Sequence, residues 1–230
     1  MAGQAADANP SLEARYSSAM NDILDPARKL LALAQSGLHF TKDPYDRDRY
    51  EEVAQLAARL LAAQVQEPGL EAGALLETWR QDKGYATPKI EVRGAIFREE
   101  RGEDRVLLVR ETIDGKWTLP GGWADINEGP RQAIEKEILQ ESGYLATAAK
   151  LAAVYDKQRH PHPPSLFHTW KLFFICDITG GAPRLSLETD GVDFFPLDRL
   201  PELSLPRTVP AQIEKMRLHH HNRHLPTEFD

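Results

Sequence analysis

The chain has 230 residues, of which 41% are hydrophobic and 27% are charged, and its formal net charge is −7. This length suits one large domain or two small ones, and the composition is that of a soluble globular protein. The negative charge argues against non-specific binding to nucleic acid, and no apolar run is long enough to span a membrane. Because the first residues also lack a basic segment followed by an apolar one, we expect a cytoplasmic protein.

Two features that resemble reactive or metal-binding sites have simpler interpretations. The single cysteine, Cys176, lies in the apolar run LFFICDI, which favours a buried thiol in a reducing compartment. A catalytic cysteine is the alternative, but the positive surroundings that would activate it are missing. Histidines at positions 219, 220, 221 and 224 resemble a metal-binding tract, yet near a chain end we expect them to be solvated.

The first third of the chain has the apolar periodicity of helices, after a loose tail over residues 1 to about 10. Asp25 and Pro26 are typical of a helix start, and they predict a helix that ends near Gly37. A second helix is expected from Asp43 and Pro44, with an apolar stripe formed by Val53, Leu56, Ala57, Leu60 and Leu61. A short third helix is expected to carry Leu70, Leu75, Leu76 and Trp79. These helices form a marginal core alone, so we expect them to pack on another surface.

After the linker KGYATPK the spacing of apolar residues changes to a period of two, which is typical of strands. Polar and glycine-rich turns separate the expected strands, which cover residues 90–97, 105–109, 151–155, 170–178 and 192–195. A final helix is expected from about Arg207 to Leu218. Strands on both sides of a central helix suit a mixed sheet between layers of helices.

The stretch GGWADINEGPRQAIEKEILQESGY, which begins at residue 121, combines a glycine pair with a helix of acidic character. Pro130 suits the first turn of that helix, and Gly143 suits a left-handed cap at its end. Glu137, Gln140 and Glu141 stand at i, i+3 and i+4, so the helix places them on one face. Stacked acids raise each other's pKa and need compensation. A hard divalent cation provides it, and we expect Mg²⁺, with Mn²⁺ as the alternative ion.

This stretch resembles the Nudix box, the signature of hydrolases that act on nucleoside diphosphates linked to another group. The spacing is kept at the matching positions, which are Gly122, Glu128, Lys136, Glu137, Ile138, Gln140, Glu141, Gly143 and Tyr144. Two residues depart from the pattern: Lys136 stands for an arginine and Gln140 for a glutamate. The segment LALAQSGLHFTKDPYDRDRYEEVAQLAARLLA is similar to the N-terminal helical domain of a bacterial subfamily that includes CDP-choline pyrophosphatase-like enzymes.

The resemblance implies a fold of the α/β class, an α/β/α sandwich with a mixed sheet, preceded by a small all-α domain. The expected domains are residues 1–87, for dimerisation, and residues 88–230, for catalysis. Members of the subfamily are dimers, so we expect a homodimer. The alternative is a helical extension that packs on its own catalytic domain.

The resemblance also implies a metal-binding set. Glu137 and Glu141 would bind the ion, together with the backbone carbonyl of Gly121. Gln140 would offer only a neutral oxygen, which weakens or removes one metal position.

Three residues are expected to act in catalysis by the same resemblance. Glu188, in the segment SLETDGVDFF, is the best match for a general base outside the box, with Glu141 as the competing candidate and a solvated loop acid as the structural alternative. Lys136 would pair with Glu128 or Glu137, orienting them less firmly than an arginine does.

Substrate contacts are expected around this stretch, each with a structural alternative. Arg110 would meet a phosphate or end its strand in solvent. Trp123 would stack on a base or pack near the core. His160 and His162 belong to the cationic loop DKQRHPHPPSLFH, which would touch the phosphate or the leaving group or be a plain surface loop. Glu128 is expected to help line the substrate site.

Together these features predict a Mg²⁺-dependent hydrolase of a nucleoside diphosphate linked to a group X, with CDP-choline and ADP-ribose as leading substrates. The products would be a nucleoside monophosphate and X-phosphate. Cleavage of an oxidised nucleoside triphosphate or of RNA ends is the alternative reaction. A nucleotide-binding sensor that lost turnover through Lys136 and Gln140 is the alternative outside enzymes.

Overall fold

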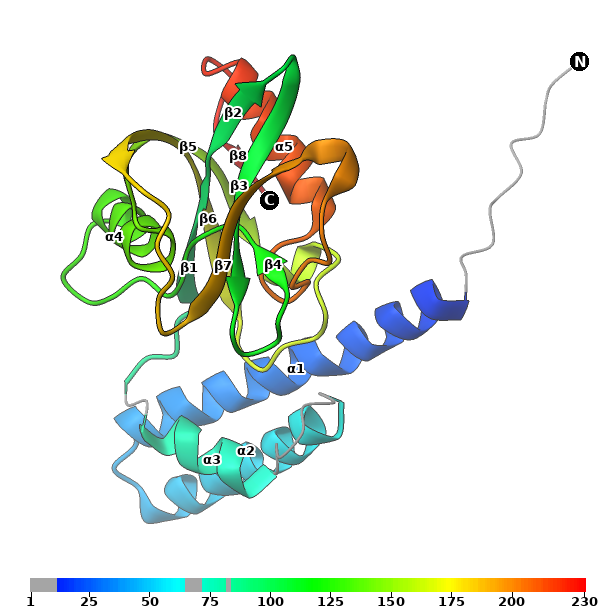
Figure 1. Cartoon of the computed structure of the whole chain (residues 1–230). Coiled ribbons are helices and arrows are strands. Elements are labelled where there is room, and N and C mark those ends of the chain that lie inside the picture. Colours follow the sequence, from blue (N-terminus) through cyan, green and yellow to red (C-terminus); the bar gives the residue numbers. More distant parts are fainter. Residues whose placement is uncertain (1–11, 65–71, 82–83) are drawn as a thin grey trace, which may run out of the picture. The chain divides into compact units, whose positions relative to one another are not determined.

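The computed structural model describes residues 12–64, 72–81 and 84–230 (Figure 1). The chain divides into two compact units. The first contains the residues up to Thr87 together with Pro164–Leu166, and the second contains Pro88–Pro163 and Phe167–Asp230. Within the described residues, no helix combines the length and apolar character needed to cross a membrane. The tail expected over residues 1 to about 10 lies outside the described part.

The first unit, called the helical unit below, is built from α1 (Leu12–Phe40), α2 (Pro44–Gln64) and α3 (Ala72–Gln81). Its core is made of small and aliphatic side chains of α1 and α2, namely Leu24, Ala27, Leu31, Ala34, Ala54, Ala57, Ala58 and Leu61. Small residues let these two helices approach closely. A Cβ atom added at Gly37 would lie 2.4 Å from the ring of Tyr50.

The predicted start of the first helix is wrong, because Pro26 lies inside α1 and the helix ends at Phe40. Proline removes one backbone hydrogen bond from a helix interior. Leu24 and Ala27, on either side of the proline, are nevertheless completely buried. The apolar stripe is therefore continuous through Pro26, and its burial outweighs the lost bond.

The predicted start of the second helix is confirmed. Asp43 Oδ1 accepts hydrogen bonds from the backbone N–H groups of Tyr45, at 2.8 Å, and Asp46, at 3.0 Å. The aspartate side chain thus satisfies two of the free N–H groups in the first turn. The third expected helix is present as α3, although Leu70 and the side chain of Leu75 lie outside the described residues.

The residues of the predicted apolar stripe of α2 are not all buried on one face of the helix. Ala57 and Leu61 are completely buried, whereas Leu56 and Leu60 are 48% and 44% exposed. The buried face is centred on alanines, which fit against α1 where larger side chains would not. Leu56 and Leu60 therefore remain on the surface of the isolated chain.

The second unit, called the sheet unit below, contains two four-stranded sheets. The mixed sheet has the order β1 (Lys89–Ala95), β6 (Thr169–Gly181), β5 (Tyr144–Asp156) and β8 (Glu228–Phe229). β1 runs parallel to β6, β5 runs antiparallel to β6, and β8 runs parallel to β5. The other sheet is antiparallel, and its central strand β3 (Glu103–Glu111) pairs with β2 (Phe97–Glu100), β4 (Trp117–Thr118) and β7 (Thr189–Pro196).

The strand expected over residues 90–97 is two strands in two sheets, and the chain passes between them at Ile96. The sequence conceals this break, because Phe97 at the start of β2 is buried like the last residues of β1. The turn within EERGED is confirmed as the tight connection of β2 and β3, where Arg101 and Gly102 both have positive φ.

Two helices lie on opposite sides of the strands, α4 (Pro130–Ser142) and α5 (Pro210–His221) (Figure 1). α4 packs through Ile134 and Ile138 on one core cluster, and α5 packs through Ile213 and Met216 on the other. Short 3₁₀ helices at Lys157–Arg159 and Leu197–Arg199 complete the unit. The predicted sandwich of helices around a mixed sheet, preceded by helices, is confirmed.

Both predicted ends of α4 are confirmed. Pro130 occupies the first turn, and Gly143 caps the end in the left-handed conformation with φ 78°, its N–H donating to Leu139 O. A Cβ atom at Gly143 would lie 2.5 Å from the carbonyl oxygen of Ala182. This glycine therefore allows the chain to turn directly from α4 into β5 beside the following segment.

Candidate active site

The glycine loop lies directly against β1. Val92 N donates to Gly122 O at 2.9 Å, and Gly94 N donates to Pro120 O at 2.8 Å. Gly121, between these two carbonyls, has φ 142°, and a Cβ atom there would lie 2.1 Å from Val92 O. Only glycine fits this position. The carbonyl of Gly121 accepts no backbone hydrogen bond from β1, unlike the carbonyls of Pro120 and Gly122.

Two of the three residues predicted on one face of α4 meet this loop. Gly121 N donates to Glu141 Oε2 at 2.7 Å, and Glu141 is only 4% exposed. A Cβ atom at Gly122 would lie 3.1 Å from Glu137 Oε2. Gln140 is exposed. The structure thus brings Glu137 and Glu141 to the glycine loop and leaves Gln140 at the surface.

Burial favours the protonated forms of Glu141 and Glu137. Burial raises the pKa of Glu141 to about 8, although the charge of Arg93 and the Gly121 N–H both oppose the shift. Burial likewise raises the pKa of Glu137. A bound cation would favour the ionised forms of both.

The oxygen donors at this corner fit a hard divalent ion. Glu137 and Glu141 offer carboxylates, and Gly121 offers a carbonyl. Over the described ranges, no group of three or more His, Cys, Asp or Glu side chains is arranged to hold a metal. Two carboxylates and one backbone oxygen would leave the remaining positions of such an ion to water and substrate.

A buried ionic network beside the loop escaped sequence reasoning. Glu91 Oε1 accepts hydrogen bonds from Arg93 Nε and from Lys171 Nζ, both at 2.7 Å. All three side chains are buried. Burial raises the pKa of Glu91, but the charges of Arg93 and Lys171 outweigh it and lower the value to about 2. Burial, opposed only in part by Glu91, lowers the pKa of Lys171 to about 7.

Arg93 links this network to the acids of the box. Its Nη1 donates to Leu119 O at 2.8 Å, next to the glycine loop, and its positive charge acts on Glu137 and Glu141. The available signal was a pair of opposite charges, Glu91 and Arg93, two residues apart in an apolar strand. Such alternation is usually typical of a solvent-exposed face.

Glu111 is a further acid that the sequence did not single out. It ends β3, is 8% exposed, and its Oε1 lies 3.0 Å from Arg207 Nε. Burial raises its pKa. The predicted base Glu188 is exposed, but its negative charge acts on both Glu111 and Glu137. Glu188 therefore stands at the edge of the same acidic group.

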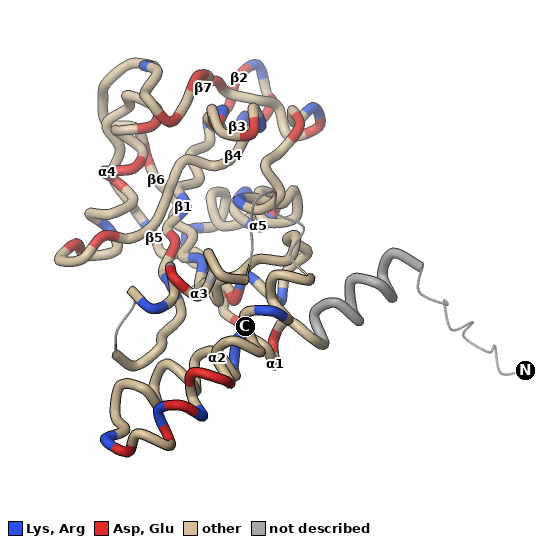
Figure 2. Tube along the Cα trace, turned by 90° about the horizontal axis from the view of Figure 1, so that it is seen from below, with Lys and Arg blue, Asp and Glu red and all other residues tan. Residues whose placement is uncertain are grey.

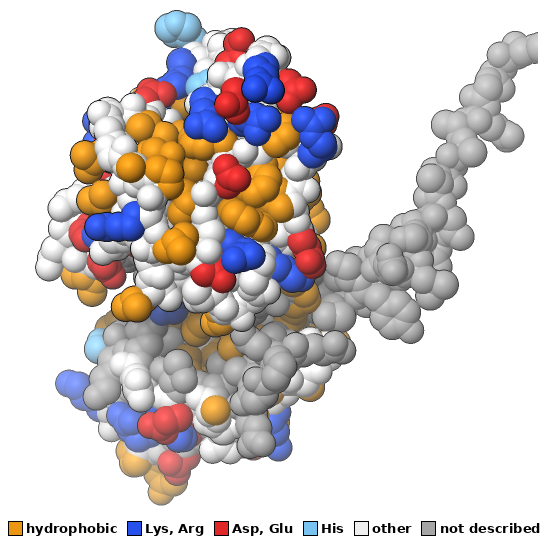
Figure 3. All heavy atoms as spheres, in the orientation of Figure 1, with side chains coloured by type: hydrophobic (Ala, Val, Ile, Leu, Met, Phe, Trp, Pro, Cys, Tyr) orange, Lys and Arg blue, Asp and Glu red, His pale blue; other side chains and the backbone are white. Residues whose placement is uncertain are grey.

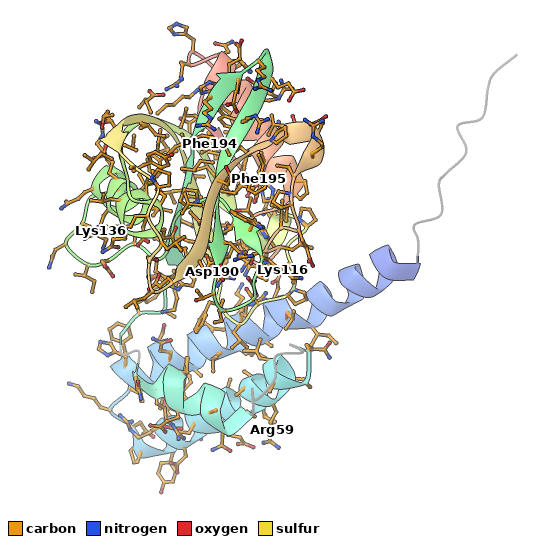
Figure 4. The ribbon with its side chains drawn as sticks, viewed as in Figure 1. Arg59, Lys116, Lys136, Asp190, Phe194 and Phe195 are labelled. Atoms are coloured by element: carbon orange, nitrogen blue, oxygen red, sulfur yellow. The ribbon has the colours of Figure 1, made fainter. Side chains whose placement is uncertain are left out.

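Lys136 joins the loop after the glycine pair to α4 (Figure 4). Its Nζ donates to Asp125 Oδ2 at 2.7 Å and to Glu128 Oε1 at 2.9 Å, and these bonds raise the pKa of Lys136. Of the two expected partners, Glu128 is found. The second carboxylate oxygen, Glu128 Oε2, is buried with no hydrogen-bond partner in the described part of the chain. A lysine supplies one nitrogen where an arginine would supply a fork.

Two residues predicted to contact substrate, Arg110 and Trp123, differ in how free their side chains are to bind a ligand. Arg110 Nε donates to Asp190 Oδ1 at 2.7 Å, so this guanidinium already has an anionic partner. Trp123 is 50% exposed and pairs by a backbone bridge with Glu91. The ring of Trp123 is therefore free on one side beside the glycine loop.

The two histidines predicted to contact substrate are held by protein groups. His162 Nδ1 donates to Leu205 O at 2.7 Å and its Nε2 accepts from Gln212 at 2.9 Å, while burial lowers its pKa to about 4. His160 Nε2 lies 3.2 Å from Asp230 Oδ1. A neutral ring with both nitrogens occupied does not bind phosphate, so His162 anchors its loop instead.

The expectation of solvated C-terminal histidines is wrong for His219. This residue is completely buried, and Lys150 and Glu228 contact its two ring nitrogens at 2.8 and 3.2 Å. His221 Nε2 lies 2.6 Å from Asp104 Oδ2. The tract ends α5, whose inner face points to the sheet, and its position near a chain end does not reveal this.

Comparisons with known proteins agree on the two parts of the chain. Residues 21–76 match the family model described as UDP-X-like, N-terminal oligomerisation domain, and residues 88–217 match the one described as NUDIX domain. The chain is 44% identical over 193 residues to YjhB of Bacillus subtilis (strain 168), provisionally named an ADP-ribose pyrophosphatase. That match covers 84% of this chain and 89% of the relative.

Two solved structures are also similar. An ADP-ribose pyrophosphatase from Streptococcus suis 89-1591 shares 34% identity with a TM-score of 0.56, covering 63% of this chain and 100% of its own. A UDP-X diphosphatase shares 31% identity with a TM-score of 0.57, covering 92% of this chain and 99% of its own.

With a chelator present, Glu141→Gln should make the protein more stable than the parent near pH 9 but not near pH 5. The pKa of Glu141 is raised from 4.5 to about 8 in the folded state. Between these values the folded protein keeps a proton that the unfolded chain has lost, so its stability falls as pH rises. Glutamine has no such proton. Urea unfolding at both pH values checks this, and parallel pH dependence of parent and variant would contradict it.

Lys136→Arg should raise the free energy of unfolding by up to about 1 kcal/mol, because its fork can donate to both oxygens of Glu128. Lys136→Met, which removes all donors, is the matched control and should lower stability. Thermal unfolding at low salt measures both changes. An arginine variant no more stable than the parent would show that the unpartnered oxygen is not reached.

Proposed function

The chain belongs to the Nudix family and is a pyrophosphohydrolase, and from this we propose that it hydrolyses the diphosphate bond of a nucleoside diphosphate linked to X with the help of Mg²⁺. The products are a nucleoside monophosphate and X-phosphate. One observation carries the proposal: the Gly121 N–H holds the buried carboxylate of Glu141 at 2.7 Å, in the same corner as Glu137. Family members generally use a divalent ion, and oxygen donors of this kind favour Mg²⁺, with Mn²⁺ as the alternative.

ADP-ribose and UDP-linked compounds stand first among the proposed substrates. Relatives similar over most of this chain carry these compounds in their names. CDP-choline remains a proposed substrate, because the N-terminal helices resemble those of a subfamily that includes CDP-choline pyrophosphatase-like enzymes. The half-exposed Trp123 beside the glycine loop is the proposed surface for the base.

The residues divide the work as follows. Glu137, Glu141 and the Gly121 carbonyl would hold the ion, which when bound neutralises the diphosphate and lowers the pKa of a water molecule. Lys136 keeps the loop in place through Asp125 and Glu128. Gln140 at the surface leaves this corner intact, which favours an enzyme over a sensor.

Glu188 is the proposed general base. It is exposed to solvent and its charge acts on Glu137, so it has access both to water and to the acids of the box. Glu111 competes for this role from the same group, but Arg207 already neutralises it. Arg110 can bind the phosphates of the substrate only if its hydrogen bond to Asp190 breaks.

We expect no nucleic-acid partner and a cytoplasmic location. At the hairpin of β2 and β3 basic side chains lie among acidic ones, and Arg98 and Arg105 share Glu100 (Figure 3). Cys176 is buried, and burial raises the pKa of its thiol to about 12, as suits an unreactive thiol.

With Mg²⁺, monophosphate release from ADP-ribose, UDP-linked sugars and CDP-choline should identify a substrate, and Glu141→Gln should lower kcat on it by about 10²–10³-fold. Loss of one charged metal ligand is the reason. Unchanged activity of the variant at limiting Mg²⁺ would overturn the metal assignment. The double variant Lys136→Arg/Gln140→Glu distinguishes the enzyme from the sensor. If the parent is inactive and these two substitutions raise its turnover by orders of magnitude, the assignment as an enzyme is refuted.

We propose that the chain is a homodimer that associates through the helical unit. Residues 21–76 match an oligomerisation domain. Apolar side chains remain on the surface of that unit, among them Leu33 at 56%, Leu56 at 48% and Leu60 at 44% exposed. Burial of such residues between two copies would stabilise a dimer.

Leu56→Lys/Leu60→Lys should convert the dimer to a monomer, because two charges would enter an apolar interface. Light scattering coupled to gel filtration measures the mass. Gln55→Lys adds a charge to the same helix at an exposed polar position and should leave the dimer intact. A parent that is already monomeric would refute the proposal.

A further inference from the structure

The helical unit contains a cavity of about 330 Å³. Its described lining residues all belong to this unit, from α1, α2, α3 and Gly84 just beyond α3. Its volume lies at the lower end of the range for pockets that bind small molecules. None of the residues proposed for catalysis lines it, so the cavity needs an explanation of its own.

The cavity wall carries more hydrogen-bond donors than acceptors. Trp79 Nε1 is buried, and no described residue accepts its N–H. Arg47 is exposed, and its guanidinium has no ion pair or hydrogen bond within the described part of the chain. Arg80 donates to Glu51 at 3.0 Å, and Glu51 is the only carboxylate among the described residues of the lining.

This donor excess indicates an anion. A buried N–H without an acceptor is rare in native structures, and an oxyanion oxygen would satisfy Trp79. Two guanidinium groups against one carboxylate leave a local positive charge, in a chain whose net charge is −7. Guanidinium forks match the oxygens of phosphate and carboxylate groups. Figure 2 shows acidic and basic positions interspersed along α2, where Arg47 lies near the start of the helix.

The rest of the wall combines polar and apolar groups. Gln35 and His39 are its other polar side chains, and Leu38 and the indole of Trp79 give it an apolar part. A bare phosphate would leave most of the cavity unfilled, whereas an organic group attached to it would contact these side chains. The ligand should therefore combine one anionic end with one apolar or planar end.

We propose that this cavity is a binding site for a small organic oxyanion, phosphorylated or carboxylated, in the helical unit. Its anionic end meets Arg47, the spare donors of Arg80 and the N–H of Trp79. The site is distinct from the corner at Glu141 and does not depend on the reaction catalysed there. Because the unit matches an oligomerisation domain, occupancy of the cavity would bear on assembly of the protein.

Calorimetric titration of the full-length protein tests the site, with AMP, 4-hydroxybenzoate and inorganic phosphate as probes. A chelator removes metal from the catalytic corner, and Glu141→Gln is titrated in parallel to recognise any heat from that corner. AMP or 4-hydroxybenzoate should bind more tightly than inorganic phosphate. The better of the two organic probes identifies the anionic group as phosphate or carboxylate.

Arg47→Gln and Trp79→Phe should each weaken binding of the better probe by at least about tenfold, since each removes a donor to the anion. Arg59→Gln is the matched control, an exposed arginine near the other end of α2 that does not line the cavity (Figure 4). It should leave affinity unchanged. Arg47 is exposed, so its variant should fold even if Trp79→Phe does not.

Three results would each overturn the site. The first is the absence of binding at millimolar concentrations of all three probes, and the second is binding that Arg47→Gln leaves unchanged. The third is a fall in mass of the ligand-free Arg47→Gln variant in light scattering, because a second copy of the chain would then be the occupant.

Discussion

The hydrogen bond from Gly121 N to Glu141 Oε2 connects the glycine loop to the last turn of α4. It can form only because the loop lies in backbone contact with β1, where a Cβ atom at Gly121 would meet Val92 O at 2.1 Å. A second glycine acts from the strand itself: a Cβ atom at Gly94 would lie 2.8 Å from Ile138 Cδ1. The distance of α4 and of the loop from β1, and with it the geometry of the acidic corner, thus depends on two missing side chains.

The same corner collects negative charge that the protein only partly neutralises. Glu111, Glu137 and Glu141 are all shifted towards protonation by burial. Arg93 is the buried cation that opposes them, and Glu91 already accepts two of its contacts. The folded chain therefore carries an electrostatic cost that a divalent cation would relieve, and binding and folding become linked. Lys171 and Arg93 together keep Glu91 ionised beside this region, which fixes the direction of the guanidinium.

Local signals in the sequence were enough for the ends of α4 and for most strands. Pro130 and Gly143 act through their own backbone preferences, so their neighbours in space do not matter. Pro26 shows the opposite case, since packing of Leu24 and Ala27 carries α1 through it. The break at Ile96 and the burial of Arg93 were equally hidden. They depend on β1 lying between β6 and the glycine loop, a non-local arrangement that alternation along one strand cannot reveal.

The parallel pairing of β1 with β6 also sets an order of assembly. Lys89 at the start of β1 pairs with Thr169, so the first strand of the sheet unit has no neighbouring strand in that sheet until β6 has been synthesised. Helices α1, α2 and α3 follow one another directly and can pack while the ribosome is still making the strands. During this interval β1 has the glycine loop and α4 as neighbours but lacks its partner strand. The emerging chain thus makes its three N-terminal helices before β1, and Glu91 meets Lys171 only after a further 80 residues have been added.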